Sequence, residues 1–178
     1  MTIAEALIAE MDQEAEATRR CLERVPEDKL GWKPHERSLS LGQLAHHVAA
    51  TPGEMAESMK SGGMELADFP EELYPAAESA ASLVLTLEKS LASAREVLTT
   101  MSDEDFMSSW RMTAGGTEMM TMPKMAVARS MMLNHWYHHR GQLAVYLRLL
   151  DIAVPAIYGP SADDNPWEEA MKSMRAGA

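Results

Sequence analysis

The chain lacks the cysteines needed for cross-linking and the long apolar stretches needed to cross a membrane. Its one cysteine, Cys21, excludes an internal disulfide framework and fits a reducing compartment. No apolar run approaches the roughly 20 residues of a membrane-spanning helix. Residues 1–10 have neither the basic start nor the long apolar core of a secretory signal. These absences predict a cytoplasmic protein with no membrane partner.

Basic side chains are also few. The 16 Lys and Arg residues stand against 27 Asp and Glu residues, which gives a net charge of −11. Nucleic-acid binding depends on the neutralisation of phosphates by cationic side chains, so this charge argues against a nucleic-acid partner. The acidic residues are scattered along the chain and indicate a solvated surface.

Phenylalanine is nearly absent, whereas methionine is abundant. The chain has 2 Phe and 16 Met residues. Methionine fills irregular gaps between helices, so packing is the favoured interpretation over a soft-metal methionine site. With 46% hydrophobic and 24% charged residues, the composition is that of a globular protein, and the length predicts one domain over residues 1–178.

Helical periodicity dominates the chain. Capping boxes are expected at Thr2 with Glu5 and at Ser40 with Gln43. No convincing strand pattern is present, and residues 112–122 are expected to form a loop or a short hairpin around Gly115-Gly116. Four long helices are predicted, at about residues 2–25, 40–60, 78–100 and 123–150, followed by a short helix capped by Asn165. The pattern predicts an all-α four-helix bundle with a short C-terminal helix.

Five of the six histidines fall into two clusters, His46-His47 and His135, His138 and His139. At about 100° per residue, His47 lies about 100° from the apolar line of its helix, at the edge of the core face. His46 lies about 160° from that line and is expected to face solvent. The apolar line of this second helix consists of Leu41, Leu44, Val48, Met55 and Met59.

In the fourth helix, His135 and His139 stand one turn apart near the centre of the predicted inward line, and His138 lies about 80° off it. The predicted inward line runs through Ala128, Met131, Met132, His135, His139, Gln142, Tyr146, Leu149 and Leu150. Two buried imidazoles need partners for their ring nitrogens, and a metal ion satisfies one nitrogen on each ring. The phases therefore select His47, His135 and His139, below called the histidine triad, as candidate metal ligands.

Three neutral histidines leave a coordination position open to water or substrate, as in catalytic zinc sites. Imidazole suits zinc, nickel, iron and copper, so the ligands do not select the metal. Histidines paired with polar groups of the core, without a metal, are the alternative. Core hydrogen bonding is favoured for Gln142 and Tyr146 over a role in orienting a ligand, and a buried, inert thiol is favoured for Cys21.

Three stretches resemble the DinB-like superfamily (damage-inducible DinB/YfiT). They are GWKPHERS at 31–38 with SLGQLAHHVA at 40–49, NHWYHHRGQL at 134–143 with YLRLL at 146–150, and VPAIYGPSAD at 154–163. The resemblance covers nearly the whole chain. It implies a bundle of up-up-down-down type, a homodimer, and a divalent ion held by His47, His135 and His139, the same residues that the phases select.

Families related to this superfamily include metal-dependent S-transferases and isomerases that use low-molecular-weight thiols such as bacillithiol or mycothiol. The resemblance therefore implies a small-molecule substrate or thiol, with zinc or nickel favoured and iron or copper also compatible. A thiol S-transferase, or a related hydrolase or isomerase, is the first hypothesis. The alternative is a non-catalytic, stress-related metal-binding or interaction protein whose metal is structural.

Overall fold

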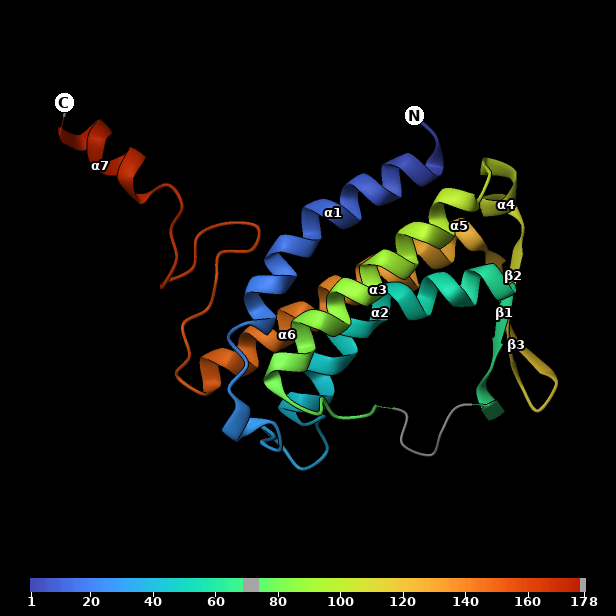
Figure 1. Ribbon diagram of the computed structural model, residues 1–178, viewed down its shortest axis with the longest axis horizontal. Helices are drawn as coiled ribbons and strands as arrows, with labels where there is room; N and C mark the ends of the chain where they lie inside the picture. The colour runs from blue at the N-terminus through green and yellow to red at the C-terminus, as the bar shows by residue number, and fades with distance from the viewer. Residues whose placement is uncertain (69–73, 177–178) are drawn as a thin grey trace.

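The structure, a computed structural model, describes residues 1–68 and 74–176 and is mostly helical. Its long helical segments lie alongside one another (Figure 1). They are α1 (Ile3–Leu22), α2 (Leu41–Ser61), α3 (Ala80–Thr100), and a last helix made of α5 (Lys124–Val127), a π-helical segment (Ala128–Asn134) and α6 (His135–Leu149). Short helices α4 (Asp103–Met107) and α7 (Glu168–Ala176) and 3-10 turns at Glu27–Lys29 and Leu66–Asp68 complete the helical elements of this part. No helix within it is long and apolar enough to cross a membrane.

The predicted capping boxes are confirmed. The Thr2 hydroxyl accepts from the backbone N–H of Glu5 at 3.1 Å, and the Glu5 carboxylate accepts from the backbone N–H of Thr2 at 2.8 Å. Ser40 and Gln43 make the same reciprocal pair at the start of α2. Because each box satisfies two orphan N–H groups at a helix start, it fixes where the helix begins.

A three-stranded sheet corrects the all-α prediction. Strand β2 (Ser109–Ala114) pairs in antiparallel fashion with β3 (Thr117–Pro123), so the hairpin alternative for residues 112–122 is confirmed. Gly115 and Gly116 form its tip at φ 56° and 77°, values that favour glycine. Strand β1 (Gly63–Glu65) pairs in parallel with β2, and a side chain at Gly63 would meet the Arg111 carbonyl oxygen at 2.4 Å.

The tip of this hairpin is held by a carboxylate from β1. Glu65 accepts from the backbone N–H groups of Ala67, Gly115 and Gly116 at 3.0, 2.8 and 3.1 Å. These hydrogen bonds stabilise the ionised form and lower the pKa of Glu65 to about 2.

The sheet closes one end of the molecule, next to the C-terminal part of α2 (Figure 1). The arrangement of the long helices as an up-up-down-down four-helix bundle stays a prediction.

A proline inside α2 frees a backbone carbonyl that another helix uses. Pro52 has no N–H, so the carbonyl of Val48, four residues earlier, has no donor within its helix. The indole N–H of Trp136 in α6 donates to this carbonyl at 2.8 Å. The next residue, Gly53, donates its N–H to the Ser90 hydroxyl of α3 at 2.8 Å. The middle of α2 is thus fixed to both neighbouring helices.

The π-helical segment changes which side chains of α6 face the core. A uniform α-helical phase predicts His135, His139 and Leu149 on the inward line. In the structure the two histidines are half-buried, and Leu149 is 57% exposed. The buried side chains of α6 are instead Trp136, Arg140, Leu143 and Leu147. Hydrogen bonds in a π-helix span five residues rather than four, so the segment takes up extra residues and rotates the helix face that follows. The predicted inward line was therefore wrong for α6.

Candidate metal centre

The histidine triad converges between α2 and α6. Nε2 of His47 lies 2.9 Å from Nε2 of His135, and one ring nitrogen from each of the three residues lies within 4.8 Å of the others. The His139 ring centroid is 4.6 Å from that of His47 and 4.4 Å from that of His135. In the described part of the chain, this is the one group of three or more His, Cys, Asp or Glu residues close enough to share an ion. The structure brings the predicted residues together, and metal binding by them stays a prediction.

A neighbouring side chain of α6 orients one ring of the triad. Nδ1 of His139 lies 2.7 Å from Oε1 of Gln142, one turn further along α6. An amide oxygen only accepts, so Nδ1 carries the proton and donates, which leaves Nε2 with a free lone pair. The predicted core role of Gln142 is wrong, because its side chain is exposed and its contact is to the triad. The Tyr146 hydroxyl donates to the Leu39 carbonyl at 3.3 Å, which agrees with the favoured interpretation.

The environment keeps the three imidazoles neutral. Burial, followed by the proximity of His139, His135 and His46, lowers the pKa of His47 to about 3. Burial is also the largest cause of the lowered pKa values of His135 and His139. At neutral pH each ring is therefore neutral and keeps one nitrogen with a free lone pair, which is the form of imidazole that a metal ion binds.

The remaining candidates lie outside the triad. His138 is exposed, as its phase predicts, whereas His46 is half-buried rather than fully solvated. Cys21 is fully buried in α1, and burial raises the pKa of its thiol. A raised pKa keeps the thiol protonated and unreactive, which agrees with the interpretation of Cys21 as an inert core residue.

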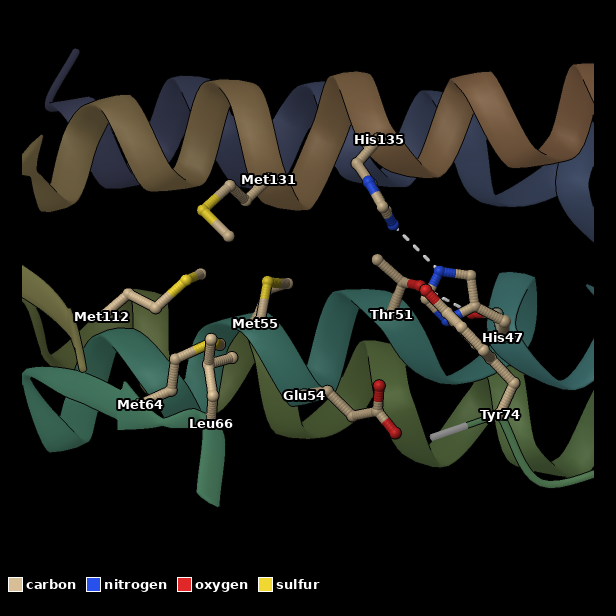
Figure 2. A pocket seen from close by; sticks show the side chains of 10 residues that line it. All are labelled: His47, Thr51, Glu54, Met55, Met64, Leu66, Tyr74, Met112, Met131 and His135. Carbon is tan, nitrogen blue, oxygen red and sulfur yellow. Dashed lines mark hydrogen bonds between the residues drawn. The ribbon is translucent and has the colours of Figure 1, made fainter. Parts of the chain in front are cut away.

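A cavity of about 250 Å³ opens beside the triad (Figure 2). His47 and His135 form one end of it, and methionines from four different elements gather at the other end. The lining consists of His47, Thr51, Glu54, Met55, Met64, Leu66, Tyr74, Met112, Met131 and His135. The abundance of methionine thus has a local use that the sequence interpretation as general packing did not identify.

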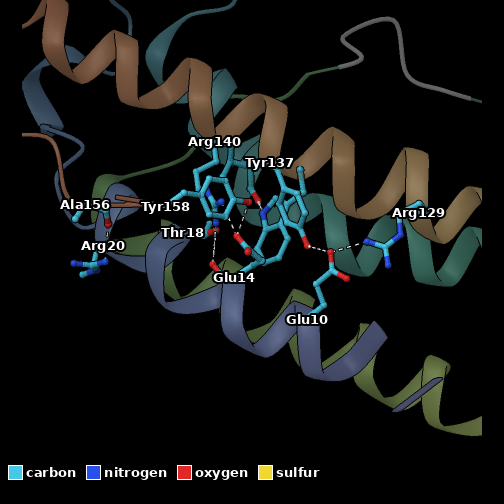
Figure 3. Close-up of polar contacts among 11 residues, drawn as sticks. Glu10, Glu14, Thr18, Arg20, Arg129, Tyr137, Arg140, Ala156 and Tyr158 are labelled. Atoms are coloured by element: carbon cyan, nitrogen blue, oxygen red, sulfur yellow. Dashed lines mark hydrogen bonds and ion pairs between the residues drawn. The ribbon is translucent and has the colours of Figure 1, made fainter. Parts of the chain in front are cut away.

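A buried ion pair behind the triad was missed by the sequence analysis (Figure 3). Arg140 Nη2 lies 2.6 Å from Glu14 Oε2, and the two side chains are 1% and 7% exposed. Arg140 Nη1 donates to the Glu14 carbonyl at 3.1 Å and to the Thr18 hydroxyl at 3.2 Å. The Tyr158 hydroxyl donates to Glu14 Oε2 at 3.0 Å, and the rings of Tyr137 and Tyr158 lie against the guanidinium. This network holds the part of α6 that carries His135 and His139 against α1 and the C-terminal segment.

The fold and the sequence both have relatives. A model of the DinB family matches residues 1–170. The uncharacterized protein YrdA of Bacillus subtilis (strain 168) is 25% identical over 151 residues, which cover 85% of each protein. A DinB-like protein from Bacillus cereus ATCC 10987 has a TM-score of 0.68 at 22% identity, over 86% of this chain and 97% of that one. The DinB-like protein YjoA of Bacillus subtilis has a TM-score of 0.62 at 19% identity, over 82% and 92%. The family match spans nearly the whole sequence and includes all three motifs, and the chain belongs to the DinB family.

Proposed function

We propose that this DinB-family protein binds one divalent metal ion through His47, His135 and His139. The observation that carries the proposal is the convergence of three neutral imidazoles next to a cavity. Metal–nitrogen bonds of about 2.0–2.1 Å require ligand nitrogens roughly 3–4 Å apart in a tetrahedral site. The separations in the triad, from 2.9 Å to an upper bound of 4.8 Å, bracket that requirement. The donor set therefore fits zinc, nickel, iron or copper, and we propose zinc or nickel as the ion.

The reaction that we propose is transfer to or from a low-molecular-weight thiol. A bound divalent ion would supply Lewis acidity, which lowers the pKa of a thiol and makes the thiolate available at neutral pH. Gln142 fixes the His139 ring through Nδ1, and contacts of this kind raise metal affinity. The half-buried position of the triad limits access of water, and the adjacent cavity admits a small molecule. A cytoplasmic homodimer is the form in which we expect the protein to act.

Metal content of purified variants tests the ligand assignment. His47→Ala, His135→Ala and His139→Ala are each expected to lose most of the bound metal, whereas the matched controls His46→Ala and His138→Ala keep it. Near-stoichiometric metal in all three triad variants would refute the site. Strong metal loss from either control would refute the choice of these three ligands.

Chelation separates the catalytic proposal from the alternative of a structural metal. Two contacts that need no ion hold the helices in place: the Trp136 indole on Val48 joins α6 to α2, and the Glu14–Arg140 pair joins α6 to α1. We therefore expect the metal-free protein to stay folded and the loaded protein to conjugate a thiol to an electrophile. A large fall in melting temperature on chelation, with no conjugation for any thiol, would favour the non-catalytic metal-binding protein.

A further inference from the structure

We propose that the metal centre receives two different reactants from two separate chambers, a small apolar molecule on one side and a polar, hydrogen-bonding thiol on the other. This inference rests on the proposed function and adds the class of each reactant. It comes from two cavities that both reach the triad, one mainly apolar and the other with a much larger share of polar surface.

The first chamber, called the methionine chamber, is the cavity beside His47 and His135. Its surface is mainly apolar, and half of its lining side chains are methionines and a leucine: Met55, Met64, Met112, Met131 and Leu66. Thr51, Glu54 and Tyr74 complete the lining beside the two histidines, and burial raises the pKa of the Glu54 carboxyl, which favours its uncharged form. The methionine side chains gather on one side of the His47–His135 pair (Figure 2). Thioethers are polarisable and adaptable, and they make favourable contacts with aromatic rings. The volume of about 250 Å³ equals that of roughly eight liquid waters at ~30 Å³ each. This chamber therefore fits an uncharged alkyl or aryl group of a small molecule.

The second chamber, called the polar chamber, lies on the His139 side of the triad and has a volume of about 260 Å³. Hydroxyl, amide and imidazole groups make up much of its surface. The lining consists of Ser38, Leu39, Leu44, Tyr74, His139, Gln142 and Tyr146. Polar groups held by a rigid frame select ligands that can hydrogen-bond to them, because a ligand without such groups leaves them unpaired. The polar chamber therefore fits the hydrophilic body of a low-molecular-weight thiol.

The triad and one tyrosine separate the chambers. His47 and His135 line the methionine chamber, His139 lines the polar chamber, and Tyr74 lines both. The Tyr74 ring packs edge-on against the His47 ring, with centroids 5.1 Å apart. Two molecules seated in the two chambers would each reach the triad without occupying the same space. Holding two reactants side by side in this way lowers the entropic part of the barrier to a bimolecular reaction.

Two probes and two variants test this division in the zinc-loaded protein. Benzyl alcohol represents the apolar reactant, and 2-mercaptoethanol represents the polar thiol. NMR spectra of methionine methyl groups report on the methionine chamber, and the side-chain amide of Gln142 reports on the polar chamber. Zinc content is measured on the same samples. Met131→Gln makes the first chamber polar, and Ser38→Leu makes the second apolar, so each variant is the control for the other.

We expect benzyl alcohol to shift the methyl signals of Met55, Met64, Met112 and Met131, and 2-mercaptoethanol to shift the Gln142 amide. Each probe should bind with an unchanged Kd when the other is saturating. Met131→Gln should raise the Kd of benzyl alcohol by about fivefold or more and leave that of 2-mercaptoethanol unchanged, because a polar amide then faces an apolar ligand. Ser38→Leu should weaken 2-mercaptoethanol binding alone.

Three results, obtained with protein that holds stoichiometric zinc, would overturn the two-chamber proposal but not the metal site. They are competition between the probes, a common set of shifted signals, and the absence of both shifts. Absence of zinc from the wild-type protein would refute the proposed function itself. The two failures are thus distinguished by the zinc content of the same sample.

Discussion

Removing the carboxylate of the buried ion pair by Glu14→Gln should destabilise the protein strongly. The substitution keeps the size of the side chain and leaves the Arg140 guanidinium, 1% exposed, without its counter-charge. Loss of one partner of a buried pair costs about 3–5 kcal/mol. Arg140 keeps its hydrogen bonds to the Glu14 carbonyl and the Thr18 hydroxyl, so we expect the lower end, about 3 kcal/mol. For a chain of this length, that corresponds to a fall in melting temperature of roughly 6–12 °C.

Urea unfolding and differential scanning calorimetry measure this loss. The matched control is Glu88→Gln, which breaks an ion pair with Arg19 on the surface. The Glu88 side chain is 49% exposed and the Arg19 side chain is 32% exposed. That variant should change stability by less than about 1 kcal/mol. The double variant Glu14→Gln/Arg140→Met removes both charges and should be more stable than Glu14→Gln alone. A Glu14→Gln variant that loses no more than the Glu88→Gln control would refute the reasoning.

Three further outcomes follow from the site and its surroundings. Acidification from about pH 6.5 towards pH 3 should destabilise the metal-free protein, because the unfolded chain takes up a proton at the ordinary pKa of 6.5 while the folded-state pKa of His47 is about 3. Urea midpoints that depend on pH equally in wild type and His47→Gln would contradict this. Trp136→Phe leaves the Val48 carbonyl without its donor and should cost about 1–3 kcal/mol by the same unfolding assay, whereas an unchanged midpoint would argue against the bond. Gln142→Leu should weaken zinc binding about 10- to 100-fold in calorimetric titration and leave the melting temperature of the metal-free protein within a few degrees, because the side chain is exposed.

Helix boundaries were predictable because their signals are local. The boxes of Thr2 with Glu5 and Ser40 with Gln43 involve residues three apart, and φ of +83° at Gly62 ends α2 as a glycine permits. Such contacts do not depend on what the rest of the chain does. These helix boundaries can therefore be predicted from the sequence without knowledge of the tertiary structure.

The three triad residues lie together in the structure as predicted, although the predicted inward face of α6 is wrong. His135 and His139 are one turn apart, so a rotation of the helix moves both together and preserves their common face. The phase of α6 depends on the π-helical hydrogen bonds of Ala128–Asn134. No local residue pattern in Ala128–Asn134 marks that change. The position relative to the core was therefore mispredicted, whereas the convergence was not.

The sheet and the buried ion pair depend on contacts between distant parts of the chain. Strand β1 is three residues long and pairs with a segment more than 40 residues away, so neither length nor alternation identifies it. Glu14 and Arg140 are 126 residues apart. Glu14 stands three residues after Met11 and four before Thr18, so the three side chains share one face of α1, and all three are buried. A carboxylate at helical spacing from such residues is the signal that could have revealed a buried partner.

Pro52 helps to hold the histidine triad together without any ion. Because the carbonyl freed in α2 is held by the Trp136 indole, the axial offset between the helices that carry His47 and His135 is set by a backbone–indole bond rather than by coordination. Little conformational entropy is then left to lose on metal uptake. The rate of metal binding should then be limited by dehydration of the ion and by its diffusion to the triad. Exchange of one metal for another should leave the backbone unchanged.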